Sequence, residues 1–151
     1  MPNPNKSPIW KLESAWRILL QGSQPIQNIS ISDDTSEIVH PAILCFATSF
    51  EEQISPGSGV FKAQMNVVLE AKVHDTTADE MSAMWEQLTQ AFYWDGSLDQ
   101  SLATRLTASL VNFHVYGVLR PHFRQDEIQP EDTVWRKHCS VDCFFMARDN
   151  S

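Results

Sequence analysis

The sequence predicts an α+β fold, with a single sheet of about four main, largely antiparallel strands and two helices packed on one face. Two neighbouring stretches carry this prediction. Residues Phe61–His74 alternate between apolar and polar side chains, with Val68 as the exception, which is typical of a strand with one buried face. Residues Met81–Phe92 change to a helical period, so this helix can pack on the apolar face of the strand. The side chains on its apolar stripe are Met81, Met84, Trp85, Leu88, Ala91 and Phe92.

The first helix is predicted to begin after Ser7, because serine is a favourable N-cap and Pro8 suits the first helical position. Gly22 suits its C-terminal end. Trp10 lies away from the centre of the apolar stripe, so we expect it to be partly exposed. Residues 1–7 form a polar, proline-bearing arm that we expect to be flexible. The apolar stripe of this helix consists of Ile9, Leu12, Trp16, Leu19 and Leu20.

A long β-hairpin is predicted in the middle of the chain. Residues Ala42–Gln53 form its first strand, and Ser55–Gly59, with the sequence Ser-Pro-Gly-Ser-Gly, is a strong turn signal before the second strand. We expect the hairpin tip, Glu51–Phe61, to project from the domain body. Residues 21–40 are polar and irregular. Three isoleucines in that segment suit a short edge strand: Ile26, Ile29 and Ile31.

The second helix has a clear start signal. Thr77 as N-cap and Glu80 three residues later form a capping box, and Asp79 adds negative charge to the first turn. The helix is therefore predicted over Ala78–Tyr93.

The C-terminal third of the chain predicts another pair of strands. Leu110–Leu119 and Thr133–Ala147 both alternate between apolar and polar side chains. Between them, residues Arg120–Asp132 are charged and contain two prolines, which predicts a long loop of the kind that is usually functional or mobile. Leu98–Ser109 is ambiguous, although its leucine spacing fits a short helix.

Length and composition indicate one domain over residues 1–151, with an apolar share of 42% that can fill a core. The net charge of −8 argues against a nucleic-acid-binding surface, because phosphate contacts need clustered Lys and Arg. DNA could still pass along an acidic wall without binding to it. The alternative is that the acidic surface only keeps the protein soluble.

No segment resembles a signal peptide or a membrane span, so we expect a soluble protein made in the cytoplasm, with no membrane partner.

The cysteines do not form a paired secretory framework. Cys139 and Cys143 lie on one face of a strand, and with His138 or Cys45 they could ligate zinc. Structural zinc sites usually draw on turn-borne pairs, however, and free cysteine is among the most buried residue types. We therefore expect all three cysteines in the core.

Catalytic motifs do not occur in the sequence. His74 beside Asp75 at a strand end could act as a general base, but no serine or cysteine lies in a recognisable nucleophile motif. We therefore predict a protein that is not an enzyme, with no catalytic, cofactor-binding or metal-binding residues.

Aromatic side chains and the hairpin tip give the better functional signal. The sequence has more aromatic residues than one small core obviously needs, and aromatic residues are enriched at interfaces. The alternative is that all of these aromatic side chains are buried between the helix layer and the sheet. The interface candidates are Trp10, Glu51, Glu52, Pro56, Phe61, Trp94, Tyr116 and Phe123.

The order of elements and two stretches of sequence resemble a known family. Asn66–Thr77, with the sequence Asn-Val-Val-Leu-Glu-Ala-Lys-Val-His-Asp-Thr-Thr, and then Met84–Leu88 look like the tail terminator and tail-completion (head–tail joining) proteins of long-tailed bacteriophages. The resemblance covers about residues 8–147 and lies in the layout of helix, hairpin, helix and strand pair. The long segment 21–41 and the several tryptophans depart from the family, so terminator, neck protein and minor tail protein all remain open.

The resemblance implies a structural virion protein of the tail or neck. Six copies would form a ring that caps the tail tube and presents a face to the head–tail connector, while DNA passes through the lumen without specific binding. Sheets would line the ring, and the hairpin turn Ser55–Gly59 and the loop Arg120–Asp132 would be the contact candidates. The competing hypothesis is a small non-phage ligand-binding or adaptor domain, either monomeric or dimeric, with a pocket at His74 and Asp75 or at the cysteines.

Overall fold

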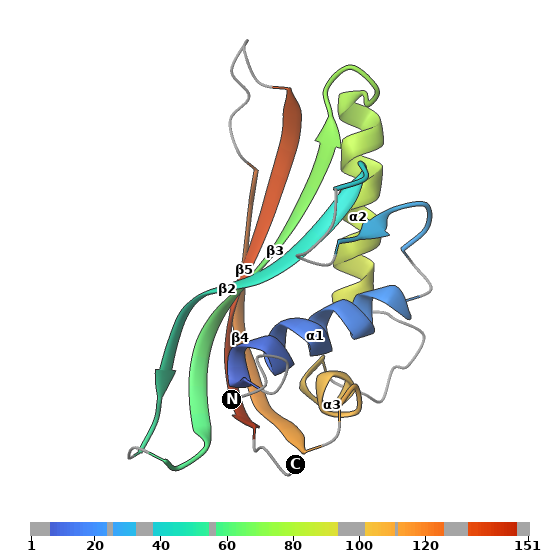
Figure 1. The fold of residues 1–151 in the computed structure, drawn as a ribbon. Coiled ribbons are helices and arrows are strands. Elements are labelled where there is room, and N and C mark those ends of the chain that lie inside the picture. The colour runs from blue at the N-terminus through green and yellow to red at the C-terminus, as the bar shows by residue number, and fades with distance from the viewer. Residues whose placement is uncertain are drawn as a thin grey trace.

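The computed structural model describes residues 7–23, 26–32, 38–54, 57–93, 102–110, 112–125 and 133–147. These residues form an α+β fold in which three helices lie on one face of a twisted five-stranded sheet (Figure 1). The elements are α1 (Pro8–Gln21), β1 (Ser30–Ile31), β2 (Ala42–Glu52), β3 (Val60–Lys72), α2 (Ala78–Tyr93), α3 (Leu102–Thr107), β4 (Phe113–Gln125) and β5 (Val134–Ala147).

The sheet is mixed, with the strand order β1-β2-β3-β5-β4. Strands β2, β3, β5 and β4 pair in antiparallel fashion, whereas β1 runs parallel to β2. The α+β class is thus confirmed, but four strands and two helices were too few. The additional strand is held by two backbone hydrogen bonds, from Ser30 N to Pro41 O and from Ser32 N to Ile43 O.

The third helix, α3, lies within the stretch that the sequence left ambiguous. Leu106 is completely buried in the core, and the Arg105 guanidinium donates to the carbonyl oxygen of Ala91 at 2.7 Å and to that of Phe92. Those carbonyls belong to the last turn of α2, where helical hydrogen-bond acceptors lack partners within the helix. The short helix therefore supplies hydrogen-bond donors to the end of α2.

The long loop predicted over Arg120–Asp132 is wrong in its first part. Strand β4 continues through Pro121 to Gln125, which pairs with Lys137 of β5. A register shift between Leu119 and His122 accommodates Pro121. An edge strand tolerates proline, which has no N–H, because a backbone position that faces away from the sheet needs no donor. The remainder of the expected loop lies outside the described residues.

Both predicted helix starts are confirmed. The Ser7 hydroxyl accepts a hydrogen bond from Trp10 N at 3.1 Å, and α1 ends at Gly22. At the start of α2, Thr77 N donates to the Glu80 carboxylate and Glu80 N donates to the Thr77 hydroxyl, at 3.3 and 3.1 Å. This reciprocal pair satisfies two backbone N–H groups that a helix N-terminus leaves unpaired.

The core fills the space between the helix layer and the inner face of the sheet. Trp16 of α1 and Phe145 of β5 are its largest fully buried side chains. Cys45, Cys139 and Cys143 are free thiols buried among them, which confirms the core assignment of the cysteines. Burial raises the pKa of each thiol to about 12, because a thiolate would lose its hydration, so these groups stay protonated and unreactive.

Candidate assembly surfaces

The turn of the β2–β3 hairpin is held by the side chain of Glu52. One carboxylate oxygen accepts from Gly57 N at 2.8 Å and the other accepts from Gly59 N at 3.1 Å. The Ser58 hydroxyl donates to Gln53 O at 2.7 Å, and both glycines adopt positive φ angles that only glycine adopts without strain. The described part of the turn is therefore a braced structure, and its hairpin runs away from the helix layer at the lower left of Figure 1.

Ile54 is the most exposed large apolar side chain described, with 89% of its surface open to solvent. Its φ angle is 73°, a left-handed conformation that is a genuine outlier for a β-branched residue. Such strain persists only where the surrounding structure imposes it, and it gathers at functional sites. The interface candidates from the sequence did not include Ile54, although an isoleucine inside an otherwise polar turn was a visible signal.

Phe61, in contrast, is buried, as the alternation of its strand predicts, although it is also one of the interface candidates. It is only 8% exposed, because β3 directs it to the helix side of the sheet. There its ring stacks on Phe50 at a centroid distance of 4.9 Å and packs against Phe145 at 5.5 Å. The hairpin is thus joined to the core by an aromatic cluster at its base.

The other interface candidates are distributed over several surfaces. Glu51 is exposed on β2, and Trp10 is half-buried on α1 as expected. Tyr116 is 55% exposed on the edge strand β4. Phe123 instead faces the helices and packs edge-on against Trp85 of α2, with ring centroids 5.6 Å apart. Two candidates lie outside the described residues: Pro56 and Trp94.

The sheet face opposite the helices is the second surface of interest, and we call it the free face. It is centred on Asn66, which is 8% exposed, donates to the Thr48 hydroxyl at 2.8 Å and accepts from the Ser140 hydroxyl at 3.1 Å. An open hollow of about 420 Å³ lies beside it. Only polar side chains line this hollow: Gln64, Asn66, His122, Arg124, Ser140 and Asp142.

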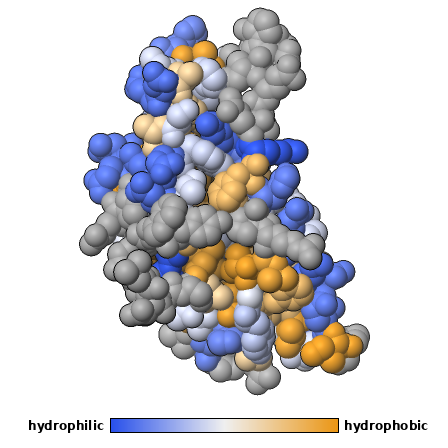
Figure 2. Space-filling model, turned by 180° about the vertical axis from the view of Figure 1, so that it is seen from behind, coloured by the Kyte–Doolittle hydropathy of each residue, from blue (hydrophilic) through white to orange (hydrophobic). Residues whose placement is uncertain are grey.

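Apolar side chains are exposed mainly along β2 and the edge strand β4. Phe46, Phe50 and Ile54 lie on or just after β2, and Tyr116 and Leu119 lie on β4. Figure 2 shows apolar side chains gathered over the lower half of the molecule from behind and again at the lower right, where the hairpin ends. Exposed apolar surface on edge strands is typical of interaction sites, since those strands also carry unpaired backbone groups.

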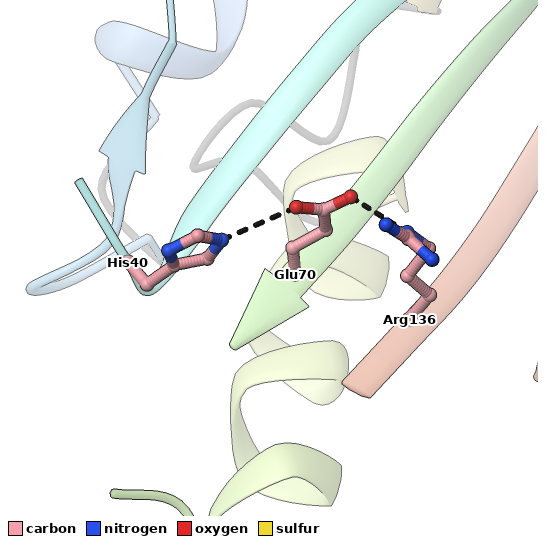
Figure 3. A network of polar contacts seen from close by, with 3 residues as sticks. All are labelled: His40, Glu70 and Arg136. Carbon is pink, nitrogen blue, oxygen red and sulfur yellow. Dashed lines mark hydrogen bonds and ion pairs between the residues drawn. The ribbon is translucent and has the colours of Figure 1, made fainter. Parts of the chain in front are cut away.

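Glu70 forms a polar network at one end of the free face (Figure 3). His40 Nε2 lies 3.2 Å from Glu70 Oε1, and Arg136 Nε donates to Glu70 Oε2 at 2.7 Å. Burial by itself would raise the pKa of Glu70, but the hydrogen bonds from Arg136 and His40 outweigh that effect and lower the pKa below its ordinary value of 4.5. The network ties β3 to β5 and to the segment that precedes β2.

The lowered pKa of Glu70 predicts a loss of stability in acid. Because the folded pKa lies below the unfolded one, the ionised group stabilises the fold above about pH 4.5, and this contribution disappears as the pH falls through the folded pKa. We expect Glu70→Gln to lower the free energy of unfolding by about 1 kcal/mol at neutral pH and by progressively less towards pH 3. Urea titrations at several pH values measure this, with Glu51→Gln on exposed β2 as the control. If the difference in free energy of unfolding between the wild type and Glu70→Gln did not change with pH, the stabilisation could not come from the ionised Glu70 carboxylate.

The pocket that the ligand-binding alternative places at His74 and Asp75 finds little room in the described residues. The hollow near Asp75 has a volume of about 140 Å³, and His74 does not line it. Pockets for small molecules usually measure about 300–1,000 Å³. Within the described ranges, no group of three or more His, Cys, Asp or Glu side chains is placed to hold a metal ion.

Comparisons with known proteins add no assignment: no protein-family model matches the chain, and no curated protein matches it significantly. Among the helices that the structure describes, none is long and apolar enough to cross a membrane.

Proposed function

We propose that this chain is a structural virion protein, a tail terminator-like ring subunit that caps a phage tail tube and joins it to the head–tail connector. Its partners are further copies of itself, the tail tube protein and the connector, and DNA passes through the ring without specific binding. The proposal rests on the sequence resemblance and on surfaces that suit repeated association between copies.

The observation that carries the proposal furthest is the braced hairpin turn. Glu52 accepts hydrogen bonds from Gly57 and Gly59, and Ile54, two residues after Glu52, is exposed to solvent in a strained conformation. A rigid apolar projection loses little conformational entropy when it enters a pocket on a neighbour. A projection that fits elsewhere on the same molecule makes a head-to-tail contact, and such contacts close into rings when the rotation between copies allows it.

The open edges of the sheet support the same proposal. Among the residues that the structure describes, β4 forms one edge of the sheet along its whole length, and β1 pairs with β2 only at Ala42 and Ile43. Further along β2, the Glu13 carboxylate of α1 accepts from Ala47 N at 2.9 Å, which protects that position. Within the described ranges, the outer edge of β2 that leads into the hairpin turn has no neighbouring strand, so we propose that it pairs with another copy.

The test is the mass of the purified protein, measured by light scattering and combined with negative-stain images, with and without purified tail tubes. The monomer has a mass of 17.2 kDa. We expect either a free ring or a monomer that closes into rings on the ends of tail tubes and stops their growth. A stable monomer or dimer that ignores tail tubes would contradict the proposal and favour the adaptor hypothesis.

A further inference from the structure

The hollow on the free face lies where a short side chain is surrounded by longer ones. Ser140 of β5 stands opposite Asn66 of β3 on one side and opposite His122 of β4 on the other. Gln64 and Asp142 face each other in the next row of the sheet. Because directly opposite side chains lie about 5 Å apart, the longer groups form a rim around the Ser140 hydroxyl. The register of three strands therefore creates the hollow.

The floor of the hollow is a chain of hydrogen bonds. The buried Asn66 side chain donates to the Thr48 hydroxyl at 2.8 Å and accepts from the Ser140 hydroxyl at 3.1 Å. The Thr48 hydroxyl in turn donates to the side-chain oxygen of Gln64 at 3.2 Å. These bonds leave the Gln64 NH₂ group as a donor and the Ser140 oxygen as an acceptor. Polar groups that are held in this way lose little conformational entropy when a ligand binds.

The walls of the hollow add further hydrogen-bonding groups. The Asp142 carboxylate only accepts, whereas a neutral His122 imidazole donates from one nitrogen and accepts at the other. Within the described ranges, neither side chain makes a hydrogen bond or an ion pair. Arg124 already interacts within the chain, so it contributes mainly its charge. That charge balances Asp142, and the lining therefore has no net charge while His122 is neutral.

Apolar side chains lie on both sides of the hollow. Phe46 of β2 is opposite Asn66 and is 39% exposed, and Leu119 of β4 is opposite Asp142 and is 47% exposed. A ligand in the hollow would thus meet hydrogen-bonding groups beneath it and apolar surface, including an aromatic ring, at its sides.

We propose that the polar hollow on the free face is a binding site for a neutral carbohydrate, a mono- or disaccharide. Sugar hydroxyls both donate and accept, so they can match the Asp142 carboxylate, which only accepts, and the Gln64 NH₂ group, which only donates. The C–H groups of a sugar ring are apolar and suit contact with Phe46. The volume of about 420 Å³ lies within the range of about 300–1,000 Å³ that is usual for small-molecule sites. The site goes beyond the proposed ring and does not depend on it, because a single subunit supplies all of it.

Other classes of ligand fit the hollow less well. A phosphate or a nucleic acid needs a surplus of cations, and Asp142 would repel it. An apolar molecule would leave the polar lining without hydrogen-bond partners. A peptide commonly binds a sheet by adding a strand to an open edge, but β3 and β5 are interior strands that are paired on both sides. A neutral ligand that carries several hydroxyls avoids all three penalties.

Saturation-transfer NMR on the full-length chain tests the site, because this method detects weak binding to a single subunit or to a ring. The probes are glucose, galactose, mannose and N-acetylglucosamine, each offered alone. We expect at least one of them to receive saturation, most strongly on the C–H protons of one face of its ring. Ser140→Leu fills the hollow with an apolar side chain, and Asp142→Asn removes the carboxylate. Each should reduce the signal at least about fivefold.

Two substitutions on α2, on the other face of the sheet, are the matched controls (Figure 1). Ser82 and Asp79 are exposed there, so Ser82→Leu and Asp79→Asn should leave the signal unchanged. Thermal unfolding verifies that each variant is folded. Ser140→Leu removes a hydrogen bond of the buried Asn66, so Asp142→Asn decides the test if Ser140→Leu does not fold.

The results that would overturn the site are specific. Either no saturation of any of the four sugars, or equal saturation in the wild type and in Asp142→Asn, would overturn it. Binding of glucose 6-phosphate without binding of glucose would make the hollow an anion site and overturn it as well. Rings that form without sugar binding would leave the proposed function intact, whereas sugar binding by a chain that forms no ring with tail tubes present would contradict the ring alone.

Discussion

Replacing Ile54 with aspartate is expected to abolish the proposed ring while the folded subunit remains at least as stable as the wild type. The side chain is 89% exposed, so its removal deprives the isolated subunit of almost no burial. In the ring it would occupy a pocket of the neighbour, and central apolar anchors of that kind carry about 2 kcal/mol or more at each contact. An aspartate at this position would also lose its hydration in that pocket without gaining a hydrogen-bond or ion-pair partner.

Because Ile54 is strained, we expect Ile54→Asp to leave the stability of the isolated subunit unchanged or to raise it. A non-glycine residue held at positive φ costs about 1–3 kcal/mol, and aspartate tolerates the left-handed region much better than isoleucine does. Thermal unfolding of the variant should therefore show an unchanged or raised midpoint while light scattering shows monomer. Ile18→Asp on α1, where the isoleucine is 42% exposed, is the matched control. Equal loss of rings in both variants would show that the hairpin turn has no special role.

Local signals were sufficient for part of the fold. The capping box consists of Thr77 and Glu80, which are close together in the sequence, and it defines the start of α2. The helix has the predicted bounds, Ala78–Tyr93. The alternation of apolar and polar side chains over Phe61–His74 likewise predicted β3, which ends two residues earlier, at Lys72. In both cases the information lies in adjacent side chains and needs no distant partner.

Long-range pairing decides what the sequence left open. The isoleucines of segment 21–40 suggested a short edge strand, and pairing with β2 places it at Ser30 and Ile31. β4 passes through Pro121 because β5 offers partners up to Lys137. Local propensity favours a break at a proline, so the loop prediction followed the local rule where tertiary pairing prevailed.

The candidate surfaces depend even more on the fold. Phe61 and Ile54 are both apolar residues near the hairpin turn, yet strand direction buries one and the turn exposes the other. The hollow on the free face combines β3, β4 and β5, so its lining residues are far apart in sequence. Single residues of this kind carry no signal until the register of the strands brings them together.

The largest loss of stability is expected from Trp16→Ala. Trp16 is completely buried, and its ring packs against Phe92 of α2 with centroids 5.5 Å apart. Truncation of a buried tryptophan typically costs about 3–5 kcal/mol, because apolar contact is lost and the cavity closes only in part. The total stability of a domain is commonly about 5–15 kcal/mol, so the variant should be close to unfolding at moderate temperature.

Trp10→Ala on the same helix separates the effect of the core from that of the helix. Trp10 is half-buried, so its truncation should cost about 1 kcal/mol and leave the cooperativity of unfolding unchanged. Urea unfolding followed by circular dichroism measures both variants. If Trp16→Ala cost no more than Trp10→Ala, α1 would not be docked on the core as the structure has it. Because the hairpin is joined to that core through Phe50, Phe61 and Phe145, a destabilised core should also weaken assembly, whereas Ile54→Asp removes assembly alone.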